Sequence, residues 1–193
     1  EENCNFIVLG RAKQSTFLDR VFSSLIDTVL QKSPSETAVL HGDFPSSKIK
    51  NILIPYGADI HTRLATEIAP ALVEHFNAKL KIAVVVDPDI SSAKRDEKIN
   101  QIQQIIDENA LTAELKIIEE HDVLKAIIKE SKNMDLVLMG GRSGDFLELL
   151  FAKSLAQQIT EQVKCPVLWV KEYEERSSFF SSLLKPHKTI GEA

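Results

Sequence analysis

Short apolar runs alternate with longer segments of helical period between residues 50 and 171, and this alternation constrains the fold more than any other feature. The runs cover residues 51–55, 80–87, 113–119, 135–140 and 166–170. They have the length of strands buried on both faces, and helical segments between consecutive strands favour a parallel sheet. The sequence therefore predicts an α/β fold, a doubly wound sheet of five parallel strands alternating with four helices.

The segments between the runs carry the apolar stripes of amphipathic helices. The last of these helices is expected at residues 146–163. Asp122 precedes the third helix and is expected to be its N-cap. Pro70 lies inside the first helix, where a missing N–H and a clash cost about 3 kcal/mol unless the helix bends. We therefore expect a bend at that position.

The N-terminal residues repeat the strand, helix and strand that close this pattern. An offset of 130 positions places Gly10 on Gly140 and Ser24 on Ser154. A unit this small cannot bury both faces of its strands, so we expect it to pack in a pseudo-twofold arrangement beside the fifth strand. Loose attachment is the alternative. The predicted parts are a half-repeat at 1–45, a complete domain at 46–173 and a flexible tail at 174–193.

Charge and composition exclude several classes of protein. The chain has 23 Lys and Arg against 28 Asp and Glu, interspersed without a basic stripe, which argues against a nucleic-acid partner. No apolar run has the roughly 18 to 20 residues of a membrane-spanning helix, and no signal peptide is recognisable. Cys4 and Cys165 are expected to be reduced thiols. The chain starts without Met, close to a strand, so we expect an excised fragment; processing is the alternative.

Five motifs, in order and at the expected spacings, resemble the universal stress protein family. They are ILIPYG, VVVDP, DLVLMGGRSG, AKSLAQQI and CPVLWV, and the resemblance covers residues 50–171. It implies a parallel sheet of strand order 3-2-1-4-5 that often dimerises through its fifth strand. In many members it also implies an adenine-nucleotide site between the first and fourth strands, for ATP, AMP or cyclic di-AMP.

The predicted fold places a ligand site in the same region. In an open parallel sheet, the crevice lies beyond the carboxyl ends of the strands where the strand order reverses, here after Pro55 and Met139. Glycines there allow backbone amides to approach phosphate oxygens, whereas a tight turn is the alternative role for a glycine pair. The candidate nucleotide-binding residues are Tyr56, Gly57, Asp59, Val85, Val86, Gly140, Gly141, Arg142, Gly144, Lys153 and Ser154.

The chain departs from the pattern of nucleotide-binding members in two places. Lys153 replaces a glycine before Ser154; it could contact a phosphate, fill the space of the phosphates or simply be solvated. Gly57 stands where ATP-binding members usually have Asp, and Asp59 is either its substitute or a turn residue. Tyr56 could stack on a base or pack in the core. We therefore expect weak ATP affinity, and none in the half-repeat, whose loop GRAKQS has one glycine.

The sequence carries no recognisable catalytic constellation. The five histidines lack metal-ligand spacing, and no P-loop or nucleophile elbow is present. The run EEHD, residues 119–122, is most simply a solvated helix start. We therefore predict a protein that is not an enzyme and has no metal site.

Two functional hypotheses remain open. The first is a cytoplasmic regulatory module that binds an adenine nucleotide and controls an attached membrane transporter. The resemblance implies that domains of this family occur as cytoplasmic parts of such transporters. The second is an interaction module with a degenerate site that forms homodimers and binds no nucleotide.

Overall fold

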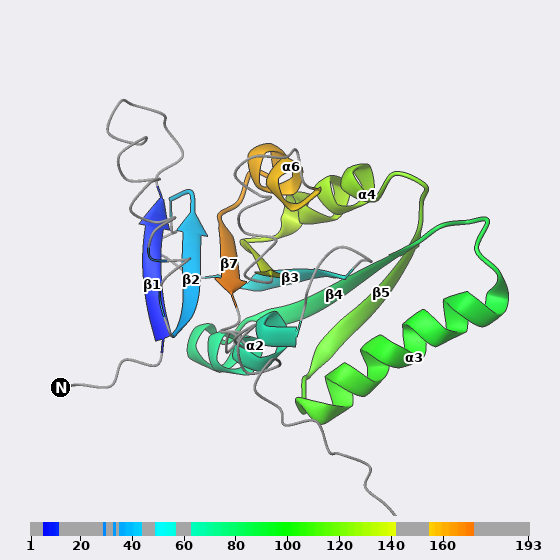
Figure 1. The fold of residues 1–193 in the computed structure, drawn as a ribbon, viewed down its shortest axis with the longest axis horizontal. Coiled ribbons are helices and arrows are strands. Elements are labelled where there is room, and N and C mark those ends of the chain that lie inside the picture. The colour runs from blue at the N-terminus through cyan, green and yellow to red at the C-terminus, as the bar shows by residue number, and fades with distance from the viewer. Residues whose placement is uncertain are drawn as a thin grey trace, which may run out of the picture.

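The computed structural model describes residues 6–11, 29, 33, 35–43, 49–56, 63–141 and 155–171. Figure 1 shows the sheet, with helices on both of its faces. The elements are β1 Phe6–Arg11, β2 Glu36–His41, β3 Asn51–Tyr56, α2 Arg63–Phe76, β4 Lys79–Val86, α3 Ser92–Glu108, β5 Ala113–Glu119, α4 Val123–Glu130, a 3₁₀ turn Ser131–Asn133, β6 Leu136–Gly141, α6 Leu155–Gln162 and β7 Val167–Lys171.

The strands form one seven-stranded sheet in the order β1-β2-β7-β6-β3-β4-β5. The five predicted strands are β3 to β7, and their order from the β5 edge is 3-2-1-4-5, as expected. Every pairing among these five strands is parallel. The predicted α/β doubly wound architecture is therefore confirmed.

Two apolar cores lie on opposite faces of the sheet because alternate residues of a strand point to opposite sides. One core contains Leu64, Ala69 and Ile102, from the α2 and α3 side. The other contains Ile127 and Ile159, from the α4 and α6 side. In Figure 1 these two helix pairs lie below and above the sheet. Strands buried on both faces explain why their sequences are nearly uninterrupted apolar runs.

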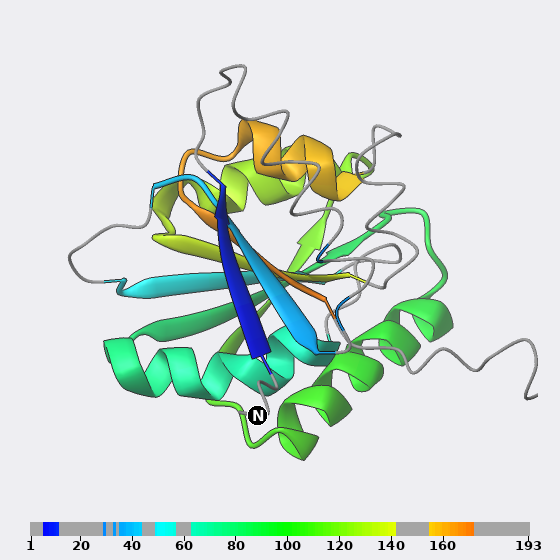
Figure 2. The ribbon, with the colours of Figure 1, turned by 60° about the vertical axis from the view of Figure 1, so that its left-hand side comes forward.

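The two N-terminal strands complete the sheet beside the fifth strand of the predicted domain. β1 and β2 pair in parallel, and β2 pairs antiparallel with β7, from Thr37 opposite Lys171 to His41 opposite Val167. Figure 2 shows β1 and β2 running steeply across the flatter strands β3 and β4, as the twist of a sheet requires. Ala38 and Val39 enter one core each. The prediction that the strands of the N-terminal unit lie beside the fifth strand is confirmed, whereas the place of its helix and the pseudo-twofold arrangement stay predictions.

Asp135 fixes the amino end of the central strand. Its Oδ2 accepts hydrogen bonds from the backbone N–H groups of Lys50 and Asn51, both at 2.9 Å. Its own N–H donates to the Asn51 carbonyl at 2.9 Å. Charge-assisted bonds of this kind are among the stronger ones in proteins, so the carboxylate sets where β3 starts beside β6.

The local predictions have mixed outcomes. Asp122 caps α4, since its Oδ1 accepts the Lys125 N–H at 3.0 Å, as predicted. α2 continues through Pro70 as one helix, so the expected bend stays a prediction. The domain boundaries near residues 45 and 173, the tail, the helix of the N-terminal unit apart from Val29 and the start of the last predicted helix fall outside the described residues. No helix in the described ranges has the length and apolar character to cross a membrane.

Candidate functional site

The central strands β3 and β6 separate along their length. Their pairing consists of Ile52 opposite Leu136 and Leu53 opposite Val137, although both strands continue beyond these residues. By contrast, β3 stays paired with β4 as far as Tyr56. The strand order reverses between β3 and β6, and ligand sites of open parallel sheets lie at such a position, beyond the carboxyl ends. We take this edge as the candidate site.

Tyr56 ends β3 at this edge. Its ring packs against the core on the α2 and α3 side, and burial raises the pKa of its hydroxyl above the ordinary value. Of the two roles considered for this residue, the structure therefore supports packing. A side chain held in this way can still border a ligand, because Tyr56 is only half-buried.

The Val85 carbonyl group is presented at the same edge. The neighbouring Val86 carbonyl accepts the Glu120 N–H at 3.1 Å, on the β5 side. Because successive carbonyls of a strand point to opposite sides, the Val85 oxygen points toward β3, which ends opposite Val84. Val85 and Val86 themselves are buried in opposite cores, so only their backbone is available to a ligand.

Lys98 is a further candidate residue at this edge, which the sequence analysis did not find. Its Nζ donates to the Val85 oxygen at 2.7 Å, from the helix α3. Burial lowers the pKa of this ammonium group, and none of the described carboxylates pairs with it. A partly buried cation, which uses one of its three N–H donors on a described group, therefore stands at the carboxyl end of β4. The sequence signal was weak, because Lys98 is one of many charged residues in α3.

The glycine loop is described only where it begins. Gly140 and Gly141 end β6, opposite Val170 and Lys171 of β7. The structure thus brings Tyr56, Val85, Val86, Gly140 and Gly141 to one edge of the sheet. The other candidates lie outside the described residues: Gly57, Asp59, Arg142, Gly144, Lys153 and Ser154.

A second group of polar side chains lies farther along this edge, after β4 and β5. Asp87, Asp89 and His121 place one ligand atom each within 4.8 Å of one another. The sequence analysis treated His121 as part of a helix start and so missed this group. The available signal was that DPD, residues 87–89, directly follows β4 and EHD, residues 120–122, directly follows β5. These strands are parallel neighbours whose carboxyl ends meet.

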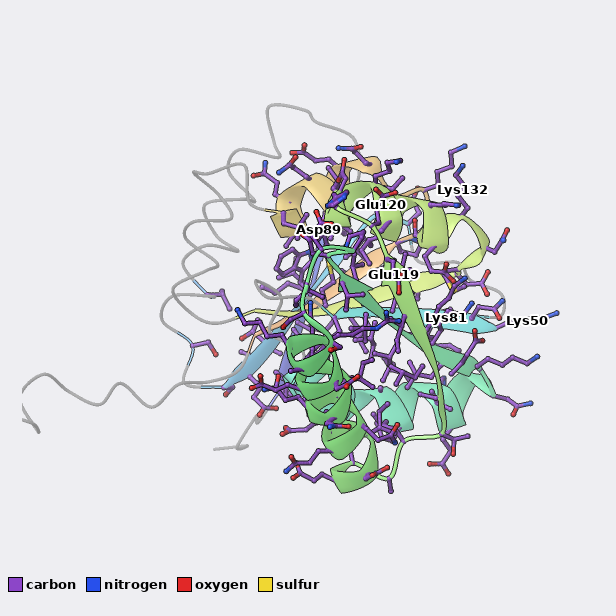
Figure 3. All side chains as sticks on the ribbon, turned by 90° about the vertical axis from the view of Figure 1, so that its right-hand side faces the viewer. Lys50, Lys81, Asp89, Glu119, Glu120 and Lys132 are labelled. Carbon is purple, nitrogen blue, oxygen red and sulfur yellow. The ribbon has the colours of Figure 1, made fainter. Side chains whose placement is uncertain are left out.

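A groove of about 590 Å³ lies at the opposite edge of the sheet, near the amino ends of β3, β4 and β5. Lys81 lines it, with Nζ 2.9 Å from Glu130 Oε1 and 3.4 Å from Glu114 Oε1. Figure 3 labels Lys81 and Lys50 on this side, away from Asp89 and Glu120. Because its central cation is already paired within the protein, we do not take this groove as the ligand site.

The ion pairs beside this groove predict a pH-dependent stability. Glu130 also lies 2.9 Å from Lys116, and its side chain is 11% exposed. Burial alone would raise the pKa of Glu130, but hydrogen bonds and charge attraction from Lys116 and Lys81 outweigh it and lower the pKa. A carboxyl group with a lowered folded-state pKa stabilises the fold above its unfolded pKa, about 4.3 for Glu, and loses this contribution as the pH falls through the folded value.

We therefore expect Glu130→Gln to lower the free energy of unfolding by roughly 1–3 kcal/mol at pH 7. The difference from wild type should shrink below about pH 4.3. Urea denaturation at pH 7, 5 and 3.5 measures both. Asp96→Asn, on an exposed position of α3, is the control and should have little effect at any pH. A difference that stays constant from pH 7 to pH 3.5 would show that the negative charge of Glu130 adds nothing to stability.

Comparison with known proteins gives a family match and a set of similar structures. The model of the universal stress protein family matches residues 48–171. No curated protein matches the chain significantly. The matched residues run from just before β3 to the end of β7, which is the five-stranded unit with both of its cores.

Three solved structures illustrate the likeness of fold. A universal stress protein from Archaeoglobus fulgidus DSM 4304 is 20% identical, with a TM-score of 0.60 over 87% of this chain and 61% of its own. The cytoplasmic domain of a prokaryotic cation chloride cotransporter is 17% identical, with a TM-score of 0.58 over 88% and 64%. A universal stress protein in complex with cAMP is 17% identical, with a TM-score of 0.51 over 65% and 98%.

The share of each chain that is matched differs among these three structures. This chain spans less than two thirds of the length of the first two, whereas the third is matched almost completely by two thirds of this chain. The likeness to the first two structures extends over 87% and 88% of this chain, and so includes residues outside 48–171.

Proposed function

Because the chain belongs to the universal stress protein family, we propose that its five-stranded unit is a non-catalytic regulatory module that binds an adenine nucleotide between β3 and β6. The observation that carries the proposal is the separation of these strands after Leu53 and Val137, next to the Val85 carbonyl that points toward the end of β3. A universal stress protein of similar fold was solved in complex with cAMP, which supports the choice of an adenine ligand.

The available groups suit the chemistry of such a ligand. The 6-amino group of adenine is a hydrogen-bond donor, and the Val85 oxygen has a second lone pair besides the one that Lys98 uses. The half-buried Tyr56 would border the base. Phosphate groups would meet the backbone amides from Gly140 to Gly144 and the hydroxyl of Ser154, with Arg142 and Lys153 as cations.

The missing carboxylate after β3 sets the expected affinity for ATP. Gly57 has no side chain to accept hydrogen bonds from the ribose hydroxyl groups, and Asp59 is the candidate substitute. We therefore propose weak binding of ATP, and treat AMP and cyclic di-AMP as equal candidates.

A regulatory role would connect this site to a larger protein. The cytoplasmic domain of a cation chloride cotransporter shares the fold across 88% of this chain. We propose that the chain acts on the cytoplasmic side of a membrane, attached to or associated with a transporter whose activity responds to the bound nucleotide.

The proposed site is tested by calorimetric titration with ATP, AMP and cyclic di-AMP, repeated on Gly144→Val. A valine side chain would stand between the loop and the phosphates, so we expect binding to weaken by about tenfold or more, equivalent to about 1.4 kcal/mol. The matched control is Gly10→Val, at the equivalent of Gly140 in the N-terminal unit, where an added Cβ has no described atom within 4 Å. Equal heats in wild type and Gly144→Val would remove this loop from the site.

A second candidate function is homodimerisation, and one observation favours it. Both edges of β7 are paired within the chain, so strand pairing between two chains would use another edge of the sheet. The edge strand β5 carries the charges of Glu114 and Lys116, which discourage strand pairing, whereas β1 has no charged residue before Arg11. Val8 of β1 is 62% exposed. We propose that two chains associate at β1.

Substituting Val8 tests this association. We expect Val8→Glu to convert a dimer to a monomer, because two like charges would face each other near the symmetry axis. Light scattering over a range of protein concentrations measures the mass. Glu114→Ala on the opposite edge is the control and should leave the mass unchanged. A wild-type protein that is monomeric at all concentrations would exclude dimerisation at this edge.

A further inference from the structure

The carboxyl groups around the ends of β4 and β5 are not equivalent in their partners. Glu119 pairs with Arg95 at 2.5 Å, and Glu120 pairs with Lys125 at 3.0 Å. Asp122 accepts the Lys125 N–H as helix cap. Each of these three acids therefore has a structural role within the protein.

Asp87 and Asp89 have no Lys or Arg partner in the described part of the chain. Asp87 Oδ1 accepts the Asp89 N–H at 2.8 Å and lies 3.2 Å from His121 Nδ1. No described side chain bonds the Asp89 carboxylate. Two carboxylate groups thus lie beside one imidazole. A cation bound here would balance charge that Lys and Arg leave unbalanced.

The backbone holds these groups in place. Asp87 opens a turn in which the Ile90 N–H donates to the Asp87 carbonyl at 3.1 Å, and Pro88 occupies the second position, which its fixed φ favours. On the neighbouring strand, the Glu120 N–H donates to the Val86 carbonyl, so His121 is carried on a backbone tied to β4. The ligand atoms therefore approach from two strand ends of the same rigid sheet.

We propose that Asp87, Asp89 and His121 form a binding site for a divalent transition metal such as Zn²⁺. Imidazole nitrogen and carboxylate oxygen are ordinary zinc ligands at about 2.0–2.2 Å from the metal. This separation places two ligands of one ion about 3.3 Å apart. The three atoms lie within 4.8 Å, and their side chains are exposed, so rotation of the side chains brings them to this spacing.

The composition of the site selects the metal class. Mg²⁺ and Ca²⁺ prefer sites made of oxygen ligands alone, whereas an imidazole suits zinc and its transition-metal neighbours. Three protein ligands leave positions for water, so the site resembles an open rather than a closed zinc site in its ligand count. It is distinct from the proposed nucleotide site, which lies between β3 and β6, and it does not depend on nucleotide binding.

Calorimetric titration of the full chain with ZnCl₂, in a buffer that does not chelate metals, tests the proposal. We expect one ion per chain. Changing a residue that merely orients a ligand weakens metal binding by about 10–100-fold, so His121→Gln and Asp89→Asn should each weaken it by at least tenfold. His75→Gln and Asp96→Asn remove an exposed histidine and an exposed aspartate elsewhere and should bind like wild type.

The zinc affinities of the wild type and these variants decide the result. Circular dichroism verifies that the exposed substitutions leave the fold intact. No saturable binding to wild type would overturn the proposal. Equal affinity in wild type, His121→Gln and Asp89→Asn would overturn it as well, because zinc would then bind elsewhere, for instance at the thiols of Cys4 or Cys165. Displacement of zinc by equimolar Mg²⁺ would contradict the assignment to a transition metal.

Discussion

Replacing Trp169 by Ala is expected to lower the free energy of unfolding by about 3–5 kcal/mol, the usual effect of truncating a buried tryptophan. Trp169 is 3% exposed and lies in the core on the α4 and α6 side. It pairs with Val39 of β2 and with Met139 of β6, so it stands where the N-terminal strands join the five-stranded unit. Since domains of this kind are stable by about 5–15 kcal/mol, this one change removes a large share.

A matched variant separates the volume of the ring from its hydrogen bond. Trp169 Nε1 donates to Thr160 Oγ1 at 2.9 Å, and Thr160 donates in turn to the Ala156 carbonyl at 2.9 Å. Trp169→Phe keeps most of the ring and loses this bond, so we expect a smaller effect, about 1–2 kcal/mol. Urea denaturation followed by circular dichroism measures both. A loss below about 1 kcal/mol in Trp169→Ala would contradict the packing described for β7.

Deleting residues 1–45 is expected to destabilise the remaining chain and to make it self-associate. The deletion removes Ala38 and Val39 from the two cores and exposes the edge of β7 that β2 covers. An open apolar edge favours pairing with another copy, as the antiparallel β2–β7 pair does within one chain. Light scattering and thermal unfolding compare the deletion with the full chain. The deletion leaves residues 48–171, which the family model matches, intact.

A point variant in the full chain is the control for this deletion. Ala38→Glu places a charge at a position that is 0% exposed, next to Val170 of β7. It should weaken the β2–β7 pairing without removing residues, and so shift stability in the same direction. A deletion that leaves both the oligomeric state and the thermal stability unchanged would mean that the N-terminal unit stabilises nothing.

The sequence pattern predicted the positions and the parallel direction of the strands because the residues that decide them have few alternative roles. Strands buried on both faces need continuous apolar runs such as those of β4 and β6, and helices between them leave parallel pairing as the simple solution. The position of β2 beside β7 was predicted from the repeat, because β2 is the counterpart of β7 in the N-terminal unit. A unit that small must also share the core of the complete domain. The strand order itself came from the resemblance to the family.

The site was less accessible to sequence reasoning because it depends on contacts between distant residues. The separation of β3 from β6 after two paired positions is a property of the twisted sheet and not of either strand sequence. Lys98 of α3 reaches the Val85 carbonyl of β4, and nothing in its own segment distinguishes it from the other charged residues. His121 meets Asp87 across 34 positions, through the pairing of β4 with β5.

The central claim is that an adenine nucleotide binds at the carboxyl edge, between β3 and β6, and amide NMR during titration with AMP tests it most directly. The predicted result is a saturable change at Tyr56, Val86 and Gly140. Amides at the opposite edge, such as those of Asn51 and Lys79 beside the groove, should stay constant. No change with AMP, ATP or cyclic di-AMP would contradict nucleotide binding, and changes confined to the opposite edge would contradict the location of the site.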